Sequence, residues 1–103
     1  MRDAETLDKL VVALCRDYQR RREAIAASAY TARTLMEYRY YNLKIFDGAA
    51  EVVGKDAAEK YITEIGEAKG YANSEIHEVS EYAYKKKKSN VKRNIAVKLH
   101  LTD

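Results

Sequence analysis

The chain contains very few of the residues that interrupt helices or cross-link a fold. Its 103 residues include no proline, four glycines and one cysteine. Without proline, and with abundant alanine, glutamate, lysine, arginine and leucine, most of the length favours helix. Cys15 has no partner for an internal disulfide, which fits a reducing cytosol, and we expect it to be a small buried hydrophobe. The expected class is all-α, a small bundle of four or five helices.

Long hydrophobic runs are also missing. The N-terminus carries Arg2, Asp3 and Glu5 and lacks an uninterrupted apolar stretch, so we expect neither a signal peptide nor a membrane span. This predicts a cytoplasmic protein.

Residues typical of chemical sites are scarce. His77 and His100 are the only histidines and stand far apart, whereas a zinc site needs several ligands at close spacing. Gly66 and Gly70 lie in helical context and do not form a phosphate-binding loop. No nucleophile stands out beside a base, and paired carboxylates occur on any charged helix. We therefore expect no enzymatic activity, no metal and no cofactor.

Charge is distributed unevenly along the chain, although the net charge is only +3. Residues 1–48 hold nine basic and seven acidic side chains, and residues 49–83 hold three basic and eight acidic ones. Residues 84–98 hold seven basic side chains and no acidic one. This asymmetry predicts an acidic middle and a basic end that meet different partners, or each other.

The spacing of apolar residues predicts two helices in the first half. Residues 3–27 place apolar side chains three, four and seven apart, which indicates a single helix. Residues 31–53 indicate a second helix, which Gly48 is expected to bend or interrupt. Gly54 is expected to cap its C-terminus, because glycine tolerates positive φ.

Two further helices are expected in the second half. Asp56 followed by Glu59 reads as a capping pair that opens a third helix, and Gly70 ends it. Asn73 or Ser74 then caps a fourth helix, whose periodicity extends nearly to the C-terminus. The sequence leaves open whether the polar residues at positions 89 and 90 break this helix.

The stretch EIGEAKGYANSEIHEV, residues 64–79, has the spacing of a helix-turn-helix. This motif needs a small residue late in its first helix, a glycine in the turn and apolar residues on the inner face of its second helix. Gly66, Gly70, Ile76 and Val79 meet these needs. We therefore expect one domain, 1–103, with a helical hairpin at 1–54 and a helix-turn-helix-like unit with a basic C-terminal helix at 56–101.

Residues 64–76 resemble the small helix-turn-helix transcriptional regulators of phages and mobile elements of the RinA and ArpU type. These share a pattern E-I-x-E-x-x-G-Y-x-x-S-x-I and a basic helical end, which KSNVKRNIAVKLHL matches less specifically. The resemblance implies a DNA-binding transcriptional regulator whose fourth helix enters the major groove. Asn73, Ser74 and His77 would then contact bases or phosphates.

Basic residues near the C-terminus predict phosphate contacts. At helical spacing Lys85, Lys88 and Lys92 share one face, and Lys86 and Arg93 share a neighbouring one. Such a row can follow a phosphate backbone, but it is equally typical of a solvated helical face. A second candidate contact, for which the basic end of a helix is the simpler interpretation, consists of Arg20, Arg21 and Arg22.

Three glutamates oppose this interpretation, because Glu75, Glu78 and Glu81 would bring negative charge toward phosphates. The alternative is a non-enzymatic protein-binding module or a small inhibitor of a host factor, acting through its acidic helical surface. The amphipathic helices of the first half can also supply a homodimer interface, which suits a two-fold symmetric DNA site. The expected partners are thus double-stranded DNA, a second copy or a host protein, and no membrane.

Overall fold

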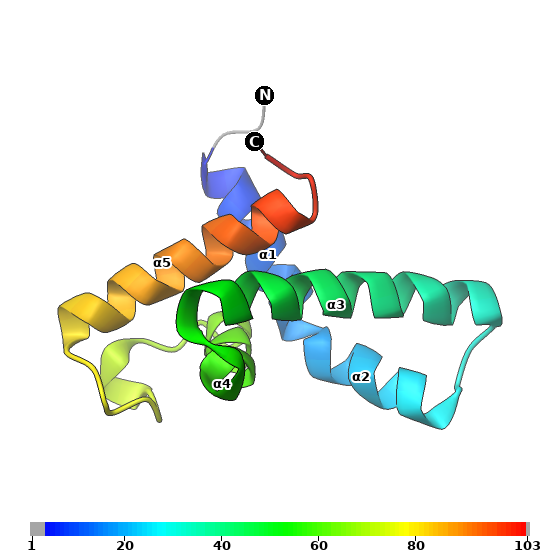
Figure 1. Cartoon of the computed structure of the whole chain (residues 1–103), viewed down its shortest axis with the longest axis horizontal. Coiled ribbons are helices and arrows are strands. Elements are labelled where there is room, and N and C mark those ends of the chain that lie inside the picture. The colour runs from blue at the N-terminus through cyan, green and yellow to red at the C-terminus, as the bar shows by residue number, and fades with distance from the viewer. Residues whose placement is uncertain (1–3, 103) are drawn as a thin grey trace.

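The structure, a computed structural model, describes residues 4–102 and is built from helices (Figure 1). The elements are α1 (Ala4–Arg16), α2 (Tyr18–Ala27), α3 (Ala32–Val53), α4 (Lys55–Gly66), the 3-10 turn η1 (Tyr71–Asn73) and α5 (Glu81–Lys98). No strand occurs between residues 4 and 102. The all-α class is therefore confirmed.

The predicted helix over residues 3–27 is divided at Asp17, so the expectation of one continuous helix is wrong. Asp17 leaves helical geometry with φ −91° and ψ 2°. Beside the break, the Leu14 carbonyl accepts a hydrogen bond from the Arg21 side chain. At the break, a side-chain donor thus supplies a hydrogen bond to a carbonyl at the end of α1. Asp3, the expected first residue, lies outside the described residues.

The boundaries of α3 follow local chemistry. The Thr31 hydroxyl accepts a hydrogen bond from the Thr34 N–H at 3.3 Å and caps the N-terminus. Gly54, with φ 89°, ends the helix as predicted. Gly48 does not interrupt α3. It allows α5 to approach closely, because a Cβ there would lie 2.9 Å from Ile95 Cα.

The third expected helix differs at both ends. Helix α4 begins directly after Gly54, so Asp56 lies within its first turn and no side chain caps it. The helix ends at Gly66 rather than Gly70, because the chain turns at Ala68, where φ is 55°. The predicted capping pair and the predicted end are therefore wrong.

The expectation that the fourth helix starts at Asn73 or Ser74 is also wrong. Residues 74–80 form a loop, and α5 starts at Glu81. The hydroxyl of Ser80 caps α5 by accepting a hydrogen bond from the Ala83 N–H at 3.2 Å. Helix α5 then continues without a break through residues 89 and 90. The long connection between α4 and α5 replaces the short turn of a helix-turn-helix.

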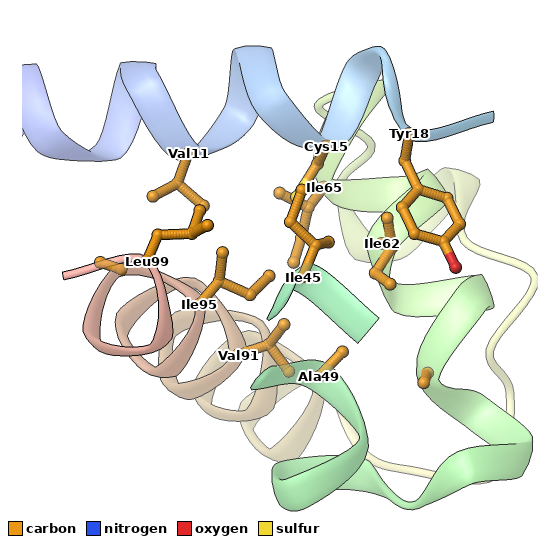
Figure 2. Close-up of a cluster of buried hydrophobic side chains, with 12 residues drawn as sticks. Val11, Cys15, Tyr18, Ile45, Ala49, Ile62, Ile65, Val91, Ile95 and Leu99 are labelled. Carbon is orange, nitrogen blue, oxygen red and sulfur yellow. The ribbon is translucent and has the colours of Figure 1, made fainter. Parts of the chain in front are cut away.

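The main hydrophobic core joins both halves of the chain, and Figure 2 shows side chains from α1, α3, α4 and α5 and from Tyr18, the first residue of α2, packed in it. Its members include Val11, Cys15, Tyr18, Ile45, Ala49, Ile62, Ile65, Val91, Ile95 and Leu99. Cys15 is buried as predicted, and burial raises the pKa of its thiol to about 12. This thiol is therefore protonated and unreactive at neutral pH.

Helix α2 and the N-terminal part of α3 extend beyond the other helices as an arm (Figure 1). The remaining helices surround the core at the base of this arm. Within residues 4–102, no helix is both long and apolar enough to cross a membrane.

Candidate nucleic-acid interface

The exposed side of α5 carries part of the predicted phosphate-binding row. Lys85, Lys86 and Arg93 are exposed, and Ser89 lies exposed between the last two. Because Lys86 and Arg93 are seven residues apart, they lie on the same side of the helix, about 10 Å apart along its axis. Ser89 lies three residues after Lys86 and four before Arg93, so helical spacing places this polar residue, which is absent from the predicted set, in the same row.

The other two predicted phosphate contacts face the protein. Lys92 forms an ion pair with Asp8 of α1, with 2.7 Å between Nζ and Oδ1. Lys88 donates a hydrogen bond to the Lys69 carbonyl, and its Nζ lies 5.1 Å from the centre of the Tyr84 ring. Burial lowers the pKa of Lys88. Both lysines hold α5 to neighbouring segments, so they are poorly placed to meet a phosphate.

The predicted base-contacting residues do not share a helical face. Asn73 is exposed at the end of η1, and His77 is exposed in the loop 74–80. Ser74 is only 5% exposed. Its hydroxyl donates to Glu64 Oε1 at 2.6 Å and accepts from the Ile76 N–H at 2.9 Å. Ser74 is therefore a structural residue that anchors the loop to α4.

Glu64 of α4 gathers the hydrogen bonds that fix this loop. Its side chain is buried, and besides Ser74 it accepts from Tyr84 Oη at 2.7 Å and from the Glu75 N–H at 2.8 Å. Three donors thus satisfy one buried carboxylate. This arrangement competes with helix at residues 74–80, because the Ser74 hydroxyl and the Glu75 N–H are committed to Glu64.

The same hydrogen bonds govern the protonation of Glu64. Burial alone would raise the pKa of this carboxyl, but the donors Ser74, Tyr84 and Glu75 outweigh burial, so the pKa lies below its ordinary value of 4.5. The charged form therefore stabilises the fold. This contribution is complete above pH 4.5 and is lost as the pH falls through the lower, folded-state pKa.

We expect Glu64→Gln to lower the free energy of unfolding by about 2 kcal/mol at pH 7. An amide has one acceptor oxygen and no charge, so one of the three donors loses its acceptor and the other two lose a charged one. The difference in unfolding free energy between this variant and the wild type should shrink toward zero as the pH falls through the folded-state pKa of Glu64. Below that pKa the wild-type carboxyl is protonated and resembles the glutamine amide. Urea denaturation followed by circular dichroism at several pH values measures this. Glu78→Gln, at an exposed loop position, is the control, and an equal effect there would contradict the assignment.

The three consecutive arginines have separate structural partners. Arg21 is 4% exposed and its Nε donates to Asn42 Oδ1 at 2.7 Å. Arg22 pairs with Glu59 at 2.7 Å. Arg20 lies beside Asp17 and contacts the hydroxyl of Tyr38. The run is therefore not a continuous basic surface, and Arg21 is unavailable to a phosphate.

Residues 4–102 hold no group of three or more histidine, cysteine, aspartate or glutamate side chains placed to bind a metal ion. Comparison with known proteins gives no match, whether to a family model, a curated protein or a solved structure. The likeness of residues 64–76 to phage regulators thus stays a prediction.

Proposed function

We propose that this protein binds DNA through the outer face of α5, contacting phosphates rather than reading bases with a recognition helix. The observation that carries the proposal is the exposed row of Lys86, Ser89 and Arg93. This row lies within residues 84–98, which contain no acidic side chain. Lysine, arginine and serine are common donors to phosphate oxygens. A role in transcription regulation rests only on the resemblance of residues 64–76.

The proposed mode differs from a helix-turn-helix for a physical reason. The exposed Glu75 and Glu78 lie in the loop before α5, and Glu81 starts the helix. Glu81 also pairs with Lys85, with 2.9 Å between Oε2 and Nζ. Negative charge at this end repels phosphates, so the contact is expected along the middle and C-terminal part of α5.

We expect the protein to bind a mixed-sequence duplex at low salt, with log affinity falling linearly with log salt. Each phosphate neutralised makes this line steeper by about 0.9, so replacing both Lys86 and Arg93 with alanine should make it shallower by about 2. Fluorescence anisotropy between about 50 and 200 mM salt measures this. The matched control replaces Lys9 and Lys60, exposed residues of α1 and α4, which removes the same charge.

If the salt dependence of DNA affinity decreases equally in the two double variants, the binding reflects only a general attraction to positive charge. Absence of binding at low salt would refute the proposal and favour a protein partner. In that case the exposed glutamates of the loop 74–80 would be the first surface to test, although they do not form the acidic helix that the sequence predicts.

A further inference from the structure

Exposed apolar side chains gather on the arm formed by α2 and α3. Seven large hydrophobic side chains are exposed among the described residues, and five of them lie between positions 30 and 43. Met36 is 67% exposed, Leu43 57% and Tyr40 43%. Clustered apolar exposure of this kind marks an interaction surface more often than scattered single residues do.

These three residues form a stripe on α3. They are spaced four and three residues apart, so they lie along one side of the helix. That side is opposite the buried residues Ile45 and Ala49, which face the rest of the protein. From Leu43, the apolar surface continues into a groove between α2 and α3 lined in part by Ile25 and Phe46.

Charged residues flank the stripe in a self-complementary order. Arg33 and Glu37 come before Tyr40 in the sequence, and Lys44 and Asp47 come after it. Helical spacing places all four on the same side of α3 as Tyr40. None of the four forms an ion pair within the part of the chain that the structure describes. Lys44 instead lies 5.7 Å from the centre of the Tyr40 ring.

We propose that the outer face of α3 pairs with the same face of a second copy, antiparallel, about a two-fold axis near Tyr40. Arg33 lies seven residues before Tyr40 and Asp47 seven after it, so the pairing brings Arg33 opposite Asp47 of the second copy. Glu37 and Lys44, three before and four after, meet in the same way. A two-fold axis makes each contact twice, which is the property of an isologous interface.

The charge order selects a second copy in this orientation. A parallel pairing would place each charge opposite its own equivalent and would be repulsive. An antiparallel pairing makes every facing pair attractive while Met36, Tyr40 and Leu43 bury their apolar surface between the helices. This proposal concerns a surface separate from the outer face of α5 and does not depend on DNA binding.

The test is a charge exchange at one facing pair, followed by sedimentation equilibrium without DNA. We expect the wild type to associate to twice the mass of the 11.8 kDa chain. Glu37→Lys alone and Lys44→Glu alone should each raise the dissociation constant by roughly tenfold, because the axis repeats every repulsive contact. The double variant should restore the wild-type value, since the exchanged charges attract again. Circular dichroism checks that each variant remains folded.

The matched control is Glu78→Lys, which makes the same charge change in the exposed loop 74–80 and should leave the dimer unchanged. A wild type that stays monomeric at every concentration overturns the proposal. So does a dimer that neither single variant weakens. Single variants that weaken the dimer without rescue by the double variant would overturn the antiparallel pairing.

Discussion

Replacing Gly66 with alanine is expected to lower the free energy of unfolding by about 3 kcal/mol. A Cβ at this position would lie 2.7 Å from the backbone nitrogen of Arg16, 2.8 Å from its Cα and 2.9 Å from the carbonyl carbon of Cys15. All three are backbone atoms of α1, so no side-chain rotation relieves the contact. Helix α1 is also held by Val11 and Cys15 in the core, which opposes its retreat. Urea denaturation followed by circular dichroism measures the loss.

Gly70→Ala is the matched control. No atom lies within 4 Å of a Cβ at Gly70, and its φ of −89° suits any residue. Alanine there should cost nothing and can stabilise by up to about 1 kcal/mol, because it restricts the unfolded chain. Similar losses at both positions would contradict the close approach of α1 and α4. The sequence predicts that Gly66 makes room for the helix after the turn, whereas its actual neighbour is α1.

Replacing Arg21 with methionine should also cost about 3 kcal/mol of unfolding free energy. Methionine keeps the apolar stem but removes the donors to Asn42 Oδ1 and the Leu14 carbonyl. The amide of Asn42 also donates to the Tyr18 carbonyl at 3.1 Å, so one network links α1, α2 and α3. Buried acceptors without partners are costly because water cannot replace the lost donors.

Arg22→Met is the matched control, because it removes the same charge at an exposed position of the same helix. Its ion pair with Glu59 joins side chains that are 57% and 44% exposed, and such pairs contribute at most about 1 kcal/mol. Thermal or urea denaturation should therefore rank Arg21→Met well below Arg22→Met in stability. Equal effects would show that the hydrogen bonds of Arg21 contribute little.

The predicted DNA-binding residues of α5 also divide into side chains that contact the protein and side chains that remain exposed. Helical spacing correctly groups Lys85, Lys88 and Lys92 on one side of α5, but spacing does not tell which side faces inward. The carbonyl of Lys69 and the carboxylate of Asp8, both far away in sequence, engage Lys88 and Lys92. Lys85 stays exposed and pairs with Glu81. Lys86 and Arg93, which are also exposed, form the neighbouring row that the sequence predicts.

The sequence alone determined the features that depend on nearby residues. Its composition predicts the helical class, Thr31 and Gly54 bound α3 through local capping chemistry, and the lack of a second cysteine predicts that Cys15 is a buried apolar side chain. Only the tertiary structure decided the start of α5. Ser74 and Ser80 are both suitable capping residues, but the buried Glu64 of α4 takes the Ser74 hydroxyl, and Ser80 remains to cap the helix. Three-dimensional packing made that choice, because a buried carboxylate must be satisfied by whatever donors the fold brings to it.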